Sequence, residues 1–164
     1  MLLVVHKEVI LDAGALRLIA QSAAQVDGMV LTPHPGEAAA LLDCSAQDIQ
    51  QHRWLSATTI SVRYKAYCVL KGYGTIITPP EGGARVCPYG NSGMAVAGMG
   101  DVLAALIAGA IAQRGLQAEV VEDAVCLHAY IGDNLAQAQG GIGIEPADMI
   151  VAIKALLNQR VVDD

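Results

Sequence analysis

Three short segments of the 164-residue chain place glycines beside a residue that can bind an anion or move a proton. They read TPHPGE at residues 32–37, KGYGT at residues 71–75 and NSGMAVAGMGD at residues 91–101. A lysine between apolar residues and glycines suits phosphate, because its ammonium supplies charge and the glycines allow close backbone approach. A glycine-rich loop that leads into a helix offers unpaired N–H groups to an anion. Together, the segments predict a site for a phosphate-containing ligand.

Asp101 is the one carboxylate in an almost wholly apolar, glycine-rich stretch at residues 91–109. If the loop turns into a helix at Gly100, Asp101 lies in the first helical turn, where the helix dipole favours an anion. We therefore predict that residues 98–101 hold an anion at a helix N-terminus, bound by the N–H groups of residues 97–100. A plain core helix that starts at Gly100 with Asp101 as a capping residue is one alternative, and it is compatible with a site in the first turn. A membrane span over residues 94–112 is the other, but a central Asp costs about 2.5–3.5 kcal/mol there.

Several other polar residues each have a functional and a structural interpretation. Lys71 is either a phosphate ligand or a surface lysine at the end of a strand. Thr75 either donates its hydroxyl to phosphate or simply begins the next strand. His34, held between two prolines, either contacts substrate or bonds to the backbone of its own loop.

Two acidic residues and one histidine favour structural roles. Glu37 is expected to serve the N-terminus of the following helix, with metal or water binding as the lesser alternative. Asp12 either caps the next helix or belongs to the site. His128 shares a helix face with apolar residues and is expected to be a core histidine. That apolar face consists of Val121, Ala124, Val125 and Ile131.

The chain alternates between strand and helix patterns in its first half, which predicts an α/β fold with a parallel sheet and helical crossovers. Buried strands are expected at residues 8–11, 29–33 and 67–72, and helices at residues 15–25, from Pro35, and from the Ser45–Asp48 capping box to about Arg63. Ligands bind beyond the carboxyl ends of such strands, where the three glycine segments would meet.

The second half of the chain changes to a hairpin followed by helices. Two short strands around residues 79–83 are expected to form a hairpin at the sheet edge. Helices are expected at residues 100–113, 119–137 and 147–159. Residues 1–164 contain no convincing linker, so the chain is interpreted as a single domain.

The composition excludes some classes of protein. Hydrophobic residues make up 54% of the chain and charged residues 16%, which is too apolar for a disordered protein. The net charge of −6 and the scattered lysines and arginines argue against a nucleic-acid partner. The four cysteines lack metal-binding spacing and lie in apolar stretches, which indicates reduced core residues of a cytoplasmic protein. No membrane partner is expected.

Three longer stretches of the chain resemble one known family. VLTPHPGEAAALL, VLKGYGTII and GNSGMAVAGMGDVLAALIAGAIAQ look like motifs of the ADP-dependent NAD(P)H-hydrate dehydratases of the ribokinase-like superfamily, and GIGIEPADMI resembles the family's closing segment. The resemblance covers the later, larger part of the family domain, from just before Val9. It implies a ribokinase-like doubly wound, mostly parallel sheet with helices on both faces, truncated at its N-terminal side.

The resemblance also implies an activity and its residues. The family uses ADP or ATP, with Mg²⁺, to remove water from hydrated NADH or NADPH, and phosphorylation of the ring hydroxyl makes that hydroxyl a leaving group. His34 and Asp101 match substrate-contacting residues, and Asp101 also matches the superfamily's catalytic base. Residues matching the adenine-nucleotide site are Lys71, Gly72, Tyr73, Gly74, Thr75, Asn91, Gly98 and Gly100. The resemblance assigns no metal ligand.

The sequence departs from the family pattern at three places. Gly14 and Arg17 stand where the family usually has Asp and Asn, and Ala105 replaces a common glycine. The alternatives to an active dehydratase are therefore a nucleotide-binding remnant or partner subunit without catalysis, and a small-molecule kinase of the same superfamily. A sheet cut short at its front exposes an edge and an apolar face, which predicts a homo-oligomer, most simply a symmetric dimer formed partly by residues 1–11.

Overall fold

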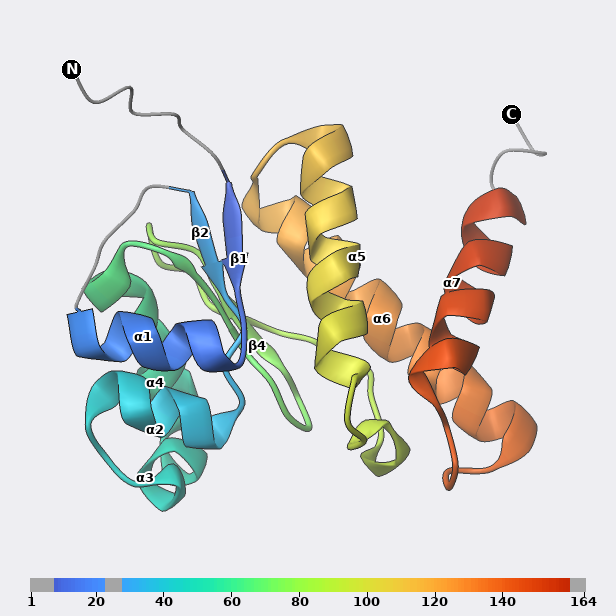
Figure 1. The fold of residues 1–164 in the computed structure, drawn as a ribbon, viewed down its shortest axis with the longest axis horizontal. Coiled ribbons are helices and arrows are strands. Elements are labelled where there is room, and N and C mark those ends of the chain that lie inside the picture. The colour runs from blue at the N-terminus through green and yellow to red at the C-terminus, as the bar shows by residue number, and fades with distance from the viewer. Residues whose placement is uncertain (1–7, 23–27, 160–164) are drawn as a thin grey trace.

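A five-stranded sheet separates two groups of helices in the computed structural model, which describes residues 8–22 and 28–159 (Figure 1). The strands lie in the order β1 (Val9–Leu11), β2 (Met29–Leu31), β3 (Tyr67–Leu70), β4 (Ile76–Thr78) and β5 (Arg85–Val86). β1, β2 and β3 are parallel, whereas β4 and β5 run antiparallel to their neighbours. The predicted crossovers and the predicted edge hairpin are both confirmed, and the described sheet is mixed.

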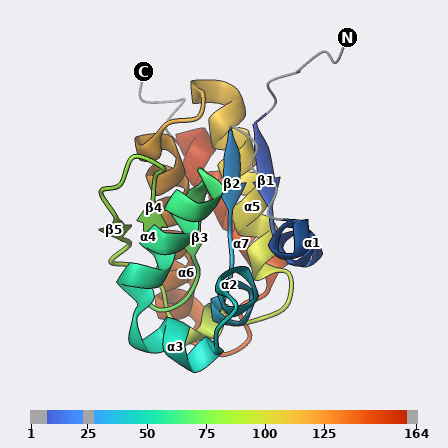
Figure 2. The ribbon, with the colours of Figure 1, turned by 90° about the vertical axis from the view of Figure 1, so that its left-hand side faces the viewer.

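Helices cover both faces of this sheet, as the resemblance implied (Figure 2). One face carries the helices of the first half of the chain, and the other carries α5 and α6, on which α7 packs. The first group consists of α1 (Gly14–Ser22), α2 (Pro35–Leu42), α3 (Ala46–Gln51) and α4 (Arg53–Tyr64). The second group consists of α5 (Met99–Arg114), α6 (Ala118–Gln139) and α7 (Pro146–Gln159), preceded by the 3₁₀ turn η1 (Ser92–Met94).

The apolar strands explain why both faces are covered. Successive side chains in a strand point to opposite faces, so a strand that is apolar throughout needs helices on both sides. In β2, Met29 and Leu31 belong to the core beneath α1, α2 and α4, whereas Val30 belongs to the core beneath α5 and α6. In β3, Leu70 faces the first core and Val69 the second.

Two predicted elements are corrected by the structure. The predicted helix from Ser45 to Arg63 is two helices, because His52 has φ −128° and ψ 42° and interrupts the helical backbone between α3 and α4. The Ser45–Asp48 capping box is confirmed at the start of α3. The strand at residues 8–11 is not buried as predicted: Val9 is 37% exposed, because β1 is the terminal strand of the described sheet.

Other sequence predictions have mixed outcomes. The predicted continuation of α1 to residue 25 lies outside the described residues, as do residues 1–7, which include most of the segment expected at a dimer interface. Cys68 and Cys87 are buried as expected, but Cys44 is exposed, because it follows the left-handed residue Asp43 that ends α2. Within residues 8–22 and 28–159, no helix has both the length and the apolar character needed to cross a membrane.

His128 is confirmed as a core histidine of α6. Its side chain is 5% exposed, and its Nε2 has no hydrogen-bond partner among the described residues. Burial lowers the pKa of His128 to about 4, and a hydrogen bond with the Met99 backbone opposes that shift only in part. The folded protein therefore holds this imidazole neutral at pH values where the unfolded chain would already protonate it.

The first prediction concerns stability in acid. The unfolded chain binds a proton at His128 near pH 6.5, whereas the folded chain binds it near pH 4, so this residue makes the free energy of unfolding fall as the pH drops between these values. His128→Gln removes the titration, and the native protein should lose up to about 3 kcal/mol more than the variant over this window. Urea unfolding of both proteins from pH 7 to pH 4 measures the difference, and parallel pH profiles would contradict the assignment.

Candidate functional site

The three glycine segments meet at one end of the sheet, as predicted. The carboxyl ends of β1, β2 and β3 lie together because these strands are parallel and adjacent. Two backbone hydrogen bonds continue the alignment past the strand ends: Thr32 N donates to Leu11 O at 3.1 Å, and Lys71 N donates to Pro33 O at 2.8 Å. The chain leaving each strand is thereby held beside its neighbour, and the side chains that follow can converge.

A cavity of about 690 Å³ opens beside this end of the sheet. Seven of the predicted site residues line it: His34, Lys71, Gly72, Tyr73, Thr75, Asn91 and Gly100. Much of the remaining wall is apolar and comes from Tyr89, Met94, Ala95, Val96, Met99, Leu103, Val125 and Ala129. Gly74, Gly98 and Asp101 are not part of its lining. The cavity therefore combines one polar end with a long apolar wall.

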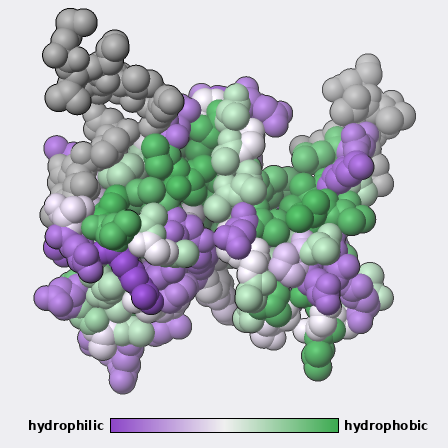
Figure 3. Space-filling model, viewed as in Figure 1, coloured by the Kyte–Doolittle hydropathy of each residue, from purple (hydrophilic) through white to green (hydrophobic). Residues whose placement is uncertain are grey.

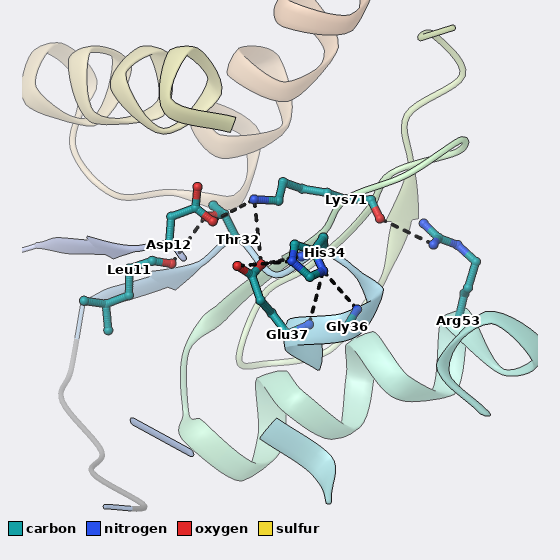
Figure 4. Close-up of polar contacts among 8 residues, drawn as sticks. All are labelled: Leu11, Asp12, Thr32, His34, Gly36, Glu37, Arg53 and Lys71. Carbon is teal, nitrogen blue, oxygen red and sulfur yellow. Dashed lines mark hydrogen bonds and ion pairs between the residues drawn. The ribbon is translucent and has the colours of Figure 1, made fainter. Parts of the chain in front are cut away.

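Lys71 lies at the polar end, between two carboxylates (Figure 4). Its Nζ is 2.7 Å from Asp12 Oδ1 and 3.9 Å from Glu37 Oε2, and its side chain is 20% exposed. This arrangement differs from that of a solvated lysine at a strand end. The Asp12 carboxylate pairs with Lys71, which favours the site role of Asp12 over the capping role.

The glycine loop turns into α5 one residue before Gly100, the predicted start. Gly98 is the N-cap with φ 87°, a left-handed conformation that suits glycine, and α5 begins at Met99. A Cβ on Gly100 would lie 3.2 Å from both Lys71 Nζ and Asp12 Oδ2. The absent side chain at Gly100 thus lets the first turn of α5 approach the Lys71–Asp12 ion pair closely.

Asp101 lies in the first turn of α5, as predicted, but faces a different hollow. This second hollow, of about 610 Å³, lies between α5 and α7 and is largely apolar. Besides Asp101, it is lined by Val102, Ala105, Leu106, Ile150, Ile153, Lys154, Leu157 and Asn158. Gly100 lines the first cavity and Asp101 lines the second, so the first turn of α5 forms a wall of both.

His34 is the N-cap of α2. Its Nδ1 accepts hydrogen bonds from Gly36 N at 2.9 Å and Glu37 N at 3.2 Å, and Glu37 Oε2 accepts from His34 N at 2.8 Å. Pro35 occupies the first helical position, and the predicted service of Glu37 to this helix N-terminus is confirmed. The His34 side chain remains 55% exposed and lines the cavity. The ring is therefore bonded to its own loop and still accessible to a ligand.

The loop after β3 has two glycines in unusual conformations. Gly72 has φ 140° and Gly74 has φ 65°, and between them Tyr73 is 90% exposed. Thr75 ends the loop, and its hydroxyl donates to Gly72 O at 2.9 Å. In this structure the Thr75 hydroxyl closes the loop, and the next strand begins directly after it at Ile76.

Asp133 is a site-supporting residue that the sequence analysis missed. From α6 it accepts hydrogen bonds from Gly90 N and Asn91 Nδ2, both at 2.9 Å, while Asn91 Oδ1 accepts from Gly93 N at 3.0 Å. Asn91 therefore caps η1 and anchors the glycine-rich loop to α6. The sequence offered only a weak signal, a carboxylate that follows the apolar residues around Ile131 and precedes Asn134.

Two curated relatives of this chain have the same described activity. The chain is 38% identical over 149 residues to the bifunctional NAD(P)H-hydrate repair enzyme Nnr of Coxiella burnetii, covering 91% of this chain and 30% of that protein. It is 34% identical to Nnr of Escherichia coli strain K12, covering 96% of this chain and 31% of that protein. The chain therefore spans about a third of the length of these relatives.

Two solved structures have a fold similar to that of this chain. The ADP/ATP-dependent NAD(P)H-hydrate dehydratase from Bacillus subtilis, co-crystallised with ATP/Mg²⁺, superposes with a TM-score of 0.82 at 26% identity, covering 92% of this chain and 54% of that one. A ribokinase-like superfamily protein from Enterococcus faecalis V583 superposes with a TM-score of 0.77 at 28% identity, covering 91% of this chain and 52% of that one. The described fold corresponds to about half of each neighbour.

The match to a family extends along most of the chain. A sequence model described as NAD(P)H-hydrate dehydratase covers residues 1–155, which include all three glycine segments that converge at the cavity. The fold, the converging segments and this match agree, and the chain belongs to the NAD(P)H-hydrate dehydratase family, with a ribokinase-like fold.

Proposed function

We propose that this chain acts in the ADP- or ATP-dependent dehydration of hydrated NADH or NADPH, with the adenine nucleotide in the Lys71 cavity. The observation that carries the proposal is the approach of Lys71 to the first turn of α5 at Gly100, in the wall of that cavity. An ammonium beside a helix N-terminus suits a phosphate chain. Membership of the family supports the choice of nucleotide and substrate.

In this proposal the phosphates take over part of the contact that Lys71 now makes with Asp12. Among residues 97–100, Met99 N already donates to Val96 O at 3.3 Å, so the other N–H groups of this segment face the transferred phosphoryl group. The loop from Lys71 to Thr75 holds the remaining phosphates. The long apolar wall of the cavity supports placement of the base and sugar there, because aromatic and aliphatic side chains pack against a purine ring.

The proposed chemistry removes a hydroxyl group that is a poor leaving group. The ring hydroxyl of the hydrated cofactor attacks the terminal phosphoryl group, and the Asp101 carboxylate accepts its proton. The bond between the terminal phosphorus and its bridging oxygen breaks, so ADP leaves as AMP and ATP leaves as ADP. Loss of phosphate and a ring proton then regenerates the reduced nicotinamide. His34 and Asp101 contact the substrate in this scheme. The exposure of Asp101 beside an apolar hollow supports a substrate ring on that side of α5.

The acidic groups near Lys71 fit a Mg²⁺ ion held mainly by nucleotide phosphates. Mg²⁺ commonly uses one or two carboxylates together with phosphate oxygens and water. Asp12 and Glu37 supply two carboxylates, and the described residues contain no cluster of three or more His, Cys, Asp or Glu that would hold a metal by themselves. Mg²⁺ would supply charge neutralisation to the phosphates when bound.

A second candidate function is nucleotide binding without turnover, as a remnant or a partner subunit. Gly14 and Arg17 in α1 stand where the family usually has Asp and Asn, and the chain spans about half of the neighbouring structures. Hydrated NADH supplied with ADP and Mg²⁺ separates the two candidates, because return of the absorbance of reduced nicotinamide requires catalysis. ADP binding without that return favours the second candidate.

A cytoplasmic location, where the four free cysteines stay reduced, is part of both proposals.

The second prediction separates the roles of two residues. Lys71→Ala should weaken ADP binding by about 10- to 100-fold, because a charge-assisted contact to phosphate contributes about 1.5–3 kcal/mol. Asp101→Asn should leave ADP affinity nearly unchanged, since Asp101 does not line the nucleotide cavity, and should lower any turnover by at least about 100-fold. Calorimetry and the dehydration assay measure both variants. Equal loss of ADP affinity in the two variants would contradict the division of roles.

We also propose that the chain forms a symmetric dimer through its exposed apolar side. β1 is the terminal strand of the described sheet, and hydrophobic side chains gather over β1 and α7 on one face of the molecule (Figure 3). On α7, Ile150 is 58% exposed and Val151 is 69% exposed. A second copy of the chain would cover both the open strand edge and the apolar groove between α5 and α7.

The third prediction tests this dimer. Light scattering at micromolar concentration should give about twice the chain mass of 17.0 kDa. Ile150→Glu should shift the protein toward monomer, because it places a charge in the apolar groove. Val62→Glu is the matched control, since Val62 is 61% exposed on α4, which covers the other face of the sheet. A native protein that scatters as a monomer would exclude the dimer.

A further inference from the structure

Arg53, the first residue of α4, binds the loop that carries Lys71. Its Nη2 donates to Leu70 O and to Gly74 O, both at 3.2 Å, and its Nη1 donates to Lys71 O at 3.4 Å. Figure 4 shows Arg53 reaching this loop from the side opposite to the Lys71 ammonium. One guanidinium therefore joins the start of the loop at residues 71–75 to its next-to-last residue, Gly74, although Arg53 itself is not part of the cavity lining.

The orientation of these carbonyls fixes the orientation of the N–H groups in the loop. A trans peptide is planar, and its C=O and N–H point in opposite directions. The Lys71 and Gly74 carbonyls point to Arg53, so the N–H groups of Gly72 and Thr75 point away from it. Gly72 and Thr75 both line the cavity. Arg53 thus turns the Lys71 and Gly74 carbonyls toward α4, so that the N–H groups of Gly72 and Thr75 point to the other side of the loop, where an anion can bind.

The local packing matches this arrangement. A Cβ on Gly72 would lie 2.9 Å from Arg53 Nη1, so the guanidinium fits against the loop only because residue 72 is glycine. Gln50 Oε1 accepts from Arg53 Nη1 at 3.1 Å and further fixes the guanidinium. The planar fork of arginine can serve several carbonyls at once, whereas the ammonium of a lysine is a compact point charge on a flexible stem.

We propose that Arg53 is a positioning residue for nucleotide phosphate binding: it holds residues 71–74 so that the Lys71 ammonium and the loop N–H groups face the phosphates. This inference rests on the proposed nucleotide site. Arg53 acts through the loop and touches neither the nucleotide nor the substrate. Its loss should therefore weaken binding of the phosphates without changing the contacts of the base and sugar.

Calorimetric titration with ADP, combined with an NMR titration with adenosine, tests the proposal. Arg53→Met keeps much of the apolar stem and should weaken ADP binding at least tenfold. Arg53→Lys should restore little of that affinity, because one ammonium cannot span the three carbonyls. Adenosine affinity, followed by ligand-observed NMR, should stay within about twofold of native. Arg63→Met is the matched control, since Arg63 lies on the same helix and donates to Leu41 O, outside the loop.

A double-mutant cycle adds a readout that general destabilisation does not produce. Arg53 and Lys71 act on the same phosphates through one loop, so the effects of Arg53→Met and Lys71→Ala on ADP affinity should be less than additive. Native-like ADP binding by both Arg53 variants, or equal losses for ADP and adenosine, would overturn the positioning role. Failure of the native chain itself to bind ADP would overturn the proposed function and this inference with it.

Discussion

The contact between Lys71 and Asp12 is the interaction on which the candidate site depends. It joins the carboxyl ends of β1 and β3 across β2, with 2.7 Å between Nζ and Oδ1, and it lies against the first turn of α5 at Gly100. Both side chains are at most 20% exposed, so each charge would be costly without the other. A phosphate placed here would meet a cation that is already oriented and a helix N-terminus that is already close.

Packing of the strands and anchoring of two loops hold the Lys71–Asp12 pair and the first turn of α5 in place. The apolar strands are packed on both faces, so β2 and β3 cannot shift register without exposing their side chains. α4 fixes the loop after β3 through Arg53, and α6 fixes the loop before α5 through Asp133. The two loops that flank the cavity are thereby tied to opposite layers of the molecule.

The side of α5 that carries Asp101 is more open to solvent than the Lys71 cavity. Asp101 borders an apolar groove between α5 and α7, and β1 leaves one edge of the sheet open. The neighbouring solved structures extend beyond this chain by nearly half of their length. The Lys71 cavity is therefore lined by residues from both halves of this chain, whereas the side of α5 that carries Asp101 presents an exposed apolar groove.

The sequence by itself determined the features that depend on near neighbours. Strand and helix positions followed from apolar patterns, and the starts of α2 and α3 followed from Pro35 and Ser45. The start of α5 was placed at Gly100, within one residue of its position at Met99, because caps and turns are set by residues within a few positions. It also placed the three glycine segments at one end of the sheet, since parallel strands share that end. The break at His52 escaped this reasoning, because helix periodicity continued through it.

Only the tertiary structure decided which distant groups meet. Asp12 and Lys71 are 59 positions apart, and Arg53 reaches carbonyls 17 to 21 positions away, so no local pattern could pair them. Asp101 was correctly placed in the first turn of α5, but the hollow it faces depends on how α7 packs beside that helix. Local backbone preferences fix where an element begins, whereas the partners of a side chain depend on how the elements pack in three dimensions.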